Sequence, residues 1–242
     1  MRKKLFWIFS VLLIMLLVFA AIIFRQGYLR YKKEVEELPL DEAVRSYTET
    51  DDYVPYDQID KDFINAVISV EDKRFFDREG YDLVAWCRAI YHNFKAKDFV
   101  EGGSTITEQI AKNLHLGGYI NTPEEKMAGI FLMRALEKNY SKEELFALYA
   151  NMNYYGDGYW GIRDAAKGYY DRDVDDLSLA QAAMLAGIPN APVVYQLSDG
   201  YELAKKRQEW VLQTMVNNQY ISKEEMEEAL TEDVHPIIKQ RS

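Results

Sequence analysis

The chain has 242 residues, 48% of them hydrophobic, which is enough apolar material for one large or two small domains with a buried core. Seven of the 29 Lys and Arg residues lie in the first 33 positions, where there is no acid. The rest of the chain therefore carries 22 basic against 39 acidic residues, a formal charge of −17, which argues against nucleic acid as a partner.

The first predicted element is an apolar segment, Leu5–Phe24, of 20 residues without a charge or a proline. At 1.5 Å per residue it can cross the roughly 30 Å hydrocarbon layer of a membrane once. A cleaved signal peptide is the alternative, but its apolar region would be shorter and would end at a small-residue cleavage site. We therefore predict an uncleaved anchor with its flanks at residues 1–33. The basic start and the anchor's position as the first segment favour a cytoplasmic N-terminus and an extracytoplasmic remainder.

A charged connector is predicted at residues 34–52, and a single mainly α domain at residues 53–242. From Tyr53 onward, apolar residues recur at spacings of three and four, which is typical of amphipathic helices. The predicted helices are Asp60–Val70, Leu83–Lys95, Ile106–Leu114, Pro123–Asn139, Lys142–Asn153, Ile162–Tyr170, Leu179–Ala186, Glu202–Asn217 and Lys223–Leu230. Several of their starts fit the capping-box pattern, Ser or Thr followed three residues later by Glu or Gln, among them those at Thr122, Ser141, Ser178 and Ser222.

The first candidate site is "VEDKRFFDREGYD", Val70–Asp82, where the adjacent acids Glu71 and Asp72 stand among cations and aromatic residues. A carboxylate in such surroundings suits a general base beside a negatively charged substrate, because its environment can tune its pKa. The alternative is a helix terminus with solvated charges.

The second candidate site is "EGGSTITEQIAKN", Glu101–Asn113, in which two glycines and hydroxyl side chains lead into a predicted helix. Thr105 and Glu108 have the spacing of a capping box, and a helix start attracts anions such as phosphate. Lys112 could add a full positive charge to the same ligand. An ordinary loop is the alternative.

Together these stretches resemble glycosyltransferase family 51, the peptidoglycan glycosyltransferases. The pattern E-D-x-x-F-x-x-H-x-G is matched at Glu71, Asp72, Phe75 and Gly80, and G-G-S-T-I-T-Q-Q-x-A-K-N is matched from Gly102 to Asn113 except at Glu108. "LEKNYSKEELFALYANMNYYGDGYWGIRDAAKGYY" and "LSLAQAAMLAGIPNAPVVY" resemble later family motifs. The resemblance covers residues 53–195.

The resemblance implies a lysozyme-like helical head with a small membrane-associated jaw, preceded by the single transmembrane helix. It further implies that the enzyme polymerises lipid II, the lipid-linked disaccharide-peptide, into glycan strands by inverting transfer with loss of polyprenyl pyrophosphate. Glu71 would be the catalytic base. The residues implied in substrate binding are Asp72, Arg74, Phe75, Arg78, Gly103, Ser104, Thr105, Gln109, Lys112, Asn113, Glu125 and Lys126.

The implied surroundings are a bacterial cell membrane, lipid II, a growing glycan strand and, as partners, a transpeptidase or other cell-wall synthesis proteins. Mg²⁺ or Mn²⁺ is a plausible companion of the substrate pyrophosphate, but no metal-ligand spacing in the sequence requires it. No S-x-x-K motif of a transpeptidase occurs in these residues. An apolar patch at Leu114–Met133 is predicted to be exposed and to form the jaw.

Three positions depart from the family pattern. Arg78 replaces a histidine, Glu108 replaces a glutamine, and the motif R-K-x-x-E aligns with Glu125–Gly129, so a second carboxylate is missing at Gly129. Glu125 could replace it from one helical turn away, or could instead cap its own helix. The hypotheses are therefore an active glycosyltransferase, a degenerate relative that binds precursor or a cell-wall partner without turnover, and a lysozyme-type enzyme that uses Glu71 as an acid.

Overall fold

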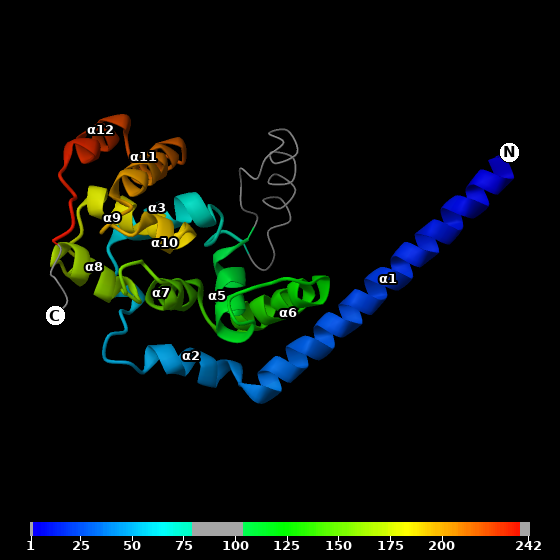
Figure 1. The fold of residues 1–242 in the computed structure, drawn as a ribbon. Helices are drawn as coiled ribbons and strands as arrows, with labels where there is room; N and C mark the ends of the chain where they lie inside the picture. The colour runs from blue at the N-terminus through cyan, green and yellow to red at the C-terminus, as the bar shows by residue number, and fades with distance from the viewer. Residues whose placement is uncertain (1, 79–103, 238–242) are drawn as a thin grey trace.

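The computed structural model describes residues 2–78 and 104–237, and it is helical in nearly all of its regular structure. Within these ranges there is no strand, and Tyr154 and Trp160 form an isolated bridge. The helices, as labelled in Figure 1, are α1 (Arg2–Glu37), α2 (Leu40–Thr48), η1 (Tyr56–Gln58), α3 (Lys61–Glu71), α5 (Ile106–His115), α6 (Pro123–Asn139), α7 (Lys142–Met152), α8 (Ile162–Tyr170), α9 (Leu179–Gly187), η2 (Ile188–Asn190), α10 (Pro192–Tyr195), α11 (Tyr201–Asn217) and α12 (Lys223–Thr231).

Local sequence signals account for most of these boundaries. The predicted mainly α fold is confirmed, and eight predicted helices agree with the structure to within one residue at each end. The ninth, Leu83–Lys95, lies outside the described residues. The predicted capping boxes at Thr122, Ser141, Ser178 and Ser222 are present, with the side chain and the N3 residue each satisfying a backbone N–H. At Thr105 the hydroxyl accepts from the N–H of Glu108, but the box is not complete.

Helices α3, α9 and α11 pack against one another in the upper part of the head in Figure 1. Helix α9 is apolar around most of its circumference, "LAQAAMLAG", and its small residues Ala180, Ala182, Ala183 and Ala186 are almost fully buried. Because alanine side chains are short, the two neighbouring helices can approach α9 closely. This packing holds the C-terminal end of α3 against α11, and the candidate site lies there.

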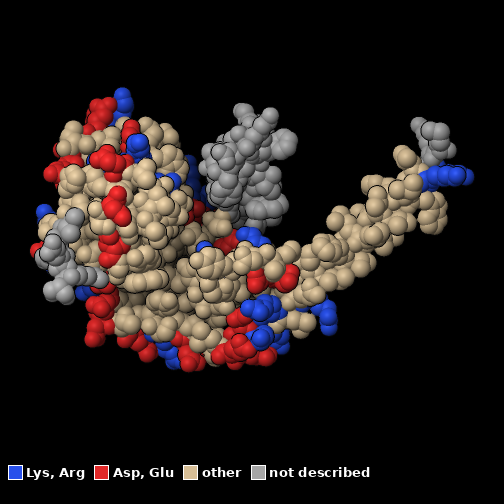
Figure 2. Space-filling view, in the orientation of Figure 1, with Lys and Arg blue, Asp and Glu red and all other residues tan. Residues whose placement is uncertain are grey.

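Helix α1 is one continuous helix of 36 residues that projects from the head, with the N-terminus at its far end (Figure 1). Figure 2 shows its middle as a bare surface without charged side chains, between the basic N-terminal end and a mixed-charge region beside the head. It is long and apolar enough to cross a membrane, and none of its most apolar stretch is buried. The predicted N-terminal transmembrane helix is confirmed as an element of the fold.

The C-terminal part of α1 packs on α6 through aromatic residues. The ring of Phe131 lies 5.2 Å from that of Phe24, 5.4 Å from Tyr28 and 5.8 Å from Tyr31. At Gly27 an added Cβ would lie 2.4 Å from the Cβ of Met127, so only glycine allows this approach of the two helices. The anchor is therefore packed on the head and is not a free tether.

The segment predicted as a connector is also largely helical. It contains the end of α1 and the whole of α2, whose Ala43 and Val44 are buried. The main-chain oxygen of Leu38 lies 3.1 Å from His115 Nε2 of α5. The proposed domain boundary at residue 53 stays a prediction, but residues before it already contribute to the packed core.

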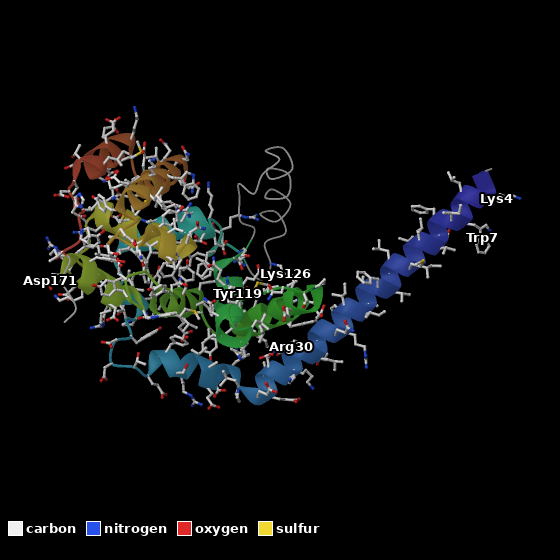
Figure 3. All side chains as sticks on the ribbon, in the orientation of Figure 1. Lys4, Trp7, Arg30, Tyr119, Lys126 and Asp171 are labelled. Atoms are coloured by element: carbon white, nitrogen blue, oxygen red, sulfur yellow. The ribbon has the colours of Figure 1, made fainter. Side chains whose placement is uncertain are left out.

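The predicted exposed patch at Leu114–Met133 is wrong for most of its residues. Leu116, Leu132 and Met133 are buried in the core, and Phe131 is covered by α1. The pattern misled because it cannot distinguish a face covered by a neighbouring helix from one facing lipid. Tyr119, 75% exposed, is the large apolar side chain of this segment that stays open to the outside (Figure 3).

Candidate functional site

Glu71 is the last residue of α3, and the buried face of this helix fixes its position. Asp60 caps the start of α3 by accepting from the N–H groups of Asp62 and Phe63. Phe63 and Val67 are almost fully buried. At Asp72 the backbone leaves the helical region, with φ −157° and ψ 77°. The Glu71 carboxylate is thus held at a rigid helix end.

Gln109 of α5 donates its Nε2 hydrogen bond to Glu71 Oε2 at 2.7 Å. Burial raises the pKa of Glu71, the neighbouring Asp72 carboxylate raises it further, and the Gln109 hydrogen bond together with the charges of Arg207 and Lys112 oppose the rise. A half-buried carboxylate whose pKa is raised by its surroundings is suited to accept a proton. The structure thus brings Glu71, Gln109 and Lys112 together, while their roles stay predictions.

Gln109 and Lys112 lie three residues apart on one face of α5, while Ile106, Ile110 and Ala111 bury the opposite face. Lys112 is partly exposed and has no ion-pair partner among the described residues. Because the charge of Lys112 acts on the Glu71 carboxyl, this cation can bind an anionic ligand beside a base.

Arg207 and Tyr149 belong to the site although the sequence did not single them out. Arg207 of α11 interacts electrostatically with Glu71 and lies 4.1 Å from the Trp210 ring, and burial lowers its pKa. Its Nε is buried without a hydrogen-bond partner in the described structure. Tyr149 of α7 is 1% exposed, and burial and Glu71 raise its pKa. In the sequence, Arg207 follows two lysines on an amphipathic helix and resembles a solvated charge.

Asp72 and Arg78, both predicted to contact substrate, belong to an internal charge network. Arg78 donates to both oxygens of Asp72 and, at 3.2 Å, to Glu137 Oε1. Glu137 also accepts from Thr107 at 2.7 Å and from Lys142 at 2.9 Å. These side chains are largely buried, so the network ties α3, α5, α6 and α7 together beneath the site. Arg78, at the family's histidine position, thus has protein partners.

Other predicted contacts have similar local partners. Phe75 is fully buried and packs on Phe76 and Phe146, with the Lys142 ammonium 4.8 Å from its ring. Thr105 is 3% exposed and accepts from the N–H of Glu108 as the N-cap of α5. Substrate contact by Phe75 or Thr105 would therefore require rearrangement.

The remaining predicted residues lie on or next to α3 and α5. Ser104 is exposed just before α5, Asn113 is half-buried on it, and Arg74 is half-buried after α3. Gly103 lies outside the described residues. Their roles in substrate binding stay predictions.

Glu125 and Lys126 point to different partners at the start of α6. Glu125 Oε2 accepts from the N–H groups of Asn121 and Thr122, at 2.9 and 3.2 Å. The capping alternative is thus the observed one, and a substitute carboxylate at Glu125 is not supported. Lys126, which is labelled in Figure 3, instead forms an ion pair with Glu108 of α5.

No group of three potential metal ligands occurs in the part of the chain that the structure describes. Glu71 and Asp72 are adjacent in sequence, but Asp72 is occupied by Arg78 and by the N–H of Ile106. These residues do not by themselves fit a protein-held divalent cation.

A family model described as transglycosylase matches residues 36–216, well over half of the chain. The chain belongs to the transglycosylase family. The resemblance to glycosyltransferase family 51 is confirmed, and with it the assignment as a glycosyltransferase of peptidoglycan synthesis. The match begins before residue 53 and continues past residue 195, so α2 and most of α11, including Arg207, lie within the transglycosylase region.

Two relatives differ in how much of their own length is matched. A Cupriavidus necator protein described as a transglycosylase is 34% identical over 230 residues, which cover 95% of this chain and 97% of that protein. Penicillin-binding protein 1F of Bacillus subtilis is 38% identical over 185 residues, which cover 76% of this chain but 26% of that protein. This transglycosylase chain thus spans about a quarter of the longer relative.

Among solved structures, penicillin-binding protein 1A from Haemophilus influenzae matches at 31% identity, with a TM-score of 0.39. The match covers 44% of this chain and 16% of that protein.

Proposed function

We propose that this transglycosylase polymerises lipid II into peptidoglycan glycan strands by inverting glycosyl transfer. The observation that supports it most directly is the Glu71 carboxyl, whose pKa is raised by burial while Gln109, Lys112 and Arg207 surround it with a donor and two positive charges. This combination provides a proton acceptor beside cations for an anionic substrate.

In the proposed reaction, Glu71 accepts the proton of the acceptor sugar hydroxyl. The hydroxyl oxygen attacks the anomeric carbon of the donor at the same time. The new carbon–oxygen bond forms as the bond from that carbon to the phosphate oxygen breaks, and polyprenyl pyrophosphate leaves with the electron pair. Attack from the opposite face inverts the anomeric centre. Lys112 and Lys126 offset the charge of the leaving group, and Arg207 stabilises the carboxylate form of Glu71 before the transfer.

The membrane context follows from α1. Its basic start at Lys3 and Lys4 favours a cytoplasmic N-terminus, so that the head works on the extracytoplasmic side of a bacterial cell membrane. Lipid II would then reach the head from the membrane surface, and the glycan strand would grow beside other cell-wall synthesis proteins such as a transpeptidase. A divalent cation would be held mainly by the pyrophosphate of the substrate.

The second candidate function is a protein that binds precursor without turnover, which the missing carboxylate at Gly129 favours. Purified full-length protein in detergent, given lipid II, separates the two. A ladder of glycan products is expected, whereas binding without product would favour the second function. Digestion of finished sacculi would indicate the lysozyme-type reaction instead.

A further inference from the structure

Glu108 is a buried acid on α5 that the proposed mechanism does not use. It is the N3 residue of the helix, and its N–H donates to Thr105 as the capping pattern predicts. In a full capping box the Glu108 carboxylate would accept a hydrogen bond from the backbone N–H of Thr105, but here it does not. It forms an ion pair with Lys126 of α6, and the Glu108 side chain is 3% exposed while that of Lys126 is 38% exposed.

The burial of the Glu108 carboxylate is difficult to explain by stability alone. Glu108 Oε2 is buried without a hydrogen-bond partner among the described residues. A buried carboxylate oxygen without a donor costs free energy, and replacing buried ion pairs by uncharged groups is often neutral or stabilising. A buried polar atom without a hydrogen-bond partner needs an explanation, and a functional role of the residue is a common explanation.

The geometry of Lys126 suggests what that role is. Glu108 occupies the buried side of the Lys126 ammonium, which has three donors and remains partly exposed on the other side. The carboxylate can therefore fix the ammonium in one place while leaving donors for a phosphate oxygen. The positive first turn of α5 lowers the cost of keeping Glu108 charged there.

Two other positions on α6 could supply a carboxylate to Lys126, and neither does so in this chain. Glu125 is engaged with the backbone at Asn121 and Thr122. Position 129 is a glycine, and a Cβ there would meet Leu116 and Ile120 side chains at 3.6 Å, an ordinary packing distance. The family pattern has glutamine at 108 and glutamate at 129, whereas this chain has glutamate at 108 and glycine at 129.

We propose that Glu108 is a positioning residue of the pyrophosphate site, which holds the Lys126 ammonium and so replaces the carboxylate missing at Gly129. One carboxylate beside Lys126 is needed, and it can come from either α5 or α6. Residue 129 lies three positions after Lys126 on the same face of α6, so a glutamate there can reach the ammonium. The inference rests on the proposed function for its turnover readout.

The test is a set of four full-length proteins: the parent, Glu108→Gln, Gly129→Glu and the double variant. Each is assayed for polymerisation of lipid II and for equilibrium binding of a short polyprenyl pyrophosphate in detergent. Glu108→Gln should lower turnover by about 10-fold or more, the scale of a misplaced group, while the probe binds as tightly as to the parent or more tightly. A misfolded variant would lose both.

Gly129→Glu puts a second carboxylate beside Lys126, so it should weaken probe binding several-fold. The double variant has one carboxylate again and should recover most of the turnover lost in Glu108→Gln. Glu225→Gln is the matched control, since Glu225 is also an N3 residue, of α12, and its carboxylate caps Ser222. It should leave both readouts unchanged.

Parent-like turnover of Glu108→Gln, or a double variant no better than Glu108→Gln, would overturn the proposal. If Glu108→Gln does not fold, unchanged probe binding by Gly129→Glu would overturn it equally. If the parent binds the probe but forms no glycan, the proposed polymerase function fails, while the two binding results still decide whether Glu108 and Lys126 act as a pair.

Discussion

At the scale of single residues, Glu71 is the side chain on which the proposed chemistry depends most. It combines burial, one hydrogen bond from Gln109 and the nearby charges of Lys112 and Arg207. Its position at the end of α3 is rigid, because the helix is capped at Asp60 and packed in the core along its length. These features are those of a preorganised proton acceptor.

The first prediction is that Glu71→Gln lowers glycan formation by about 100-fold or more, the scale of general-base loss. The amide oxygen can still accept from Gln109, so the local structure and probe binding should persist. Turnover is measured on lipid II, and probe binding serves as the folding control. Unchanged turnover would remove Glu71 from the mechanism.

The second prediction concerns stability and pH. Because the folded-state pKa of Glu71 is raised, the protonated carboxyl is favoured in the folded protein, and its contribution to stability is lost as pH rises through that pKa. Glu71→Gln should therefore melt at a higher temperature than the parent at neutral pH, by about 2–4 °C for each kcal/mol. The difference should shrink as the pH falls below the ordinary pKa of glutamate. An equal Tm of the parent and Glu71→Gln at neutral pH would contradict the raised pKa of Glu71 in the folded protein.

At the scale of elements, the helices around the site are tied together by the buried network of Asp72, Arg78, Glu137 and Lys142. The network joins the end of α3 to α6 and α7, and Thr107 adds α5. A change in it should act on the whole site through the positions of these helices.

The third prediction is that Arg78→Met costs about 3–5 kcal/mol of unfolding free energy, because Asp72 and Glu137 lose a buried cation. Arg172→Met is the matched control, since Arg172 forms an exposed ion pair with Asp176 at 2.7 Å and should cost about 1 kcal/mol or less. Urea unfolding measures both. A similar cost for the two variants would show that the buried network contributes no more than a surface pair.

At the scale of the whole molecule, the packing of α1 on α6 connects the membrane anchor to the site. Helix α6 carries Phe131, which contacts α1, and Lys126, which contacts α5. The anchor is therefore packed on the same helix that carries Lys126. An apolar helix of 36 residues would be about 54 Å long, so it can cross the membrane and still reach α6.

The fourth prediction is that Gly27→Leu separates α1 from α6, because even a Cβ at Gly27 would overlap Met127. Glycan formation in vesicles should fall several-fold, while the protein stays in the membrane. Ala21→Leu, on the exposed apolar part of α1, is the control and should leave activity unchanged. The distance between spin labels on α1 and α8 reports the separation directly. A parent-like distance in Gly27→Leu would show that the close approach is not required.

The sequence by itself determined the features that depend on neighbouring residues. Capping boxes set the starts of α6, α7, α9 and α12, apolar spacing set the helix lengths, and an uncharged segment set the transmembrane helix. These signals act within a few turns of one helix, so no partner is needed to recognise them. The motif that contains Glu71 was recognisable for the same reason.

Only the tertiary structure decided which side chains meet. Arg207 lies near Glu71 although it is more than a hundred positions away in the chain. Glu108 forms an ion pair with Lys126 and does not bind the Thr105 backbone through its carboxylate. The apolar face of α6 turned toward α1 and away from solvent. In each case the local sequence pattern is compatible with two arrangements of the side chain or helix face. Packing and charge from residues distant in the chain decide between them, and the periodicity and spacing of one segment carry no information about those residues.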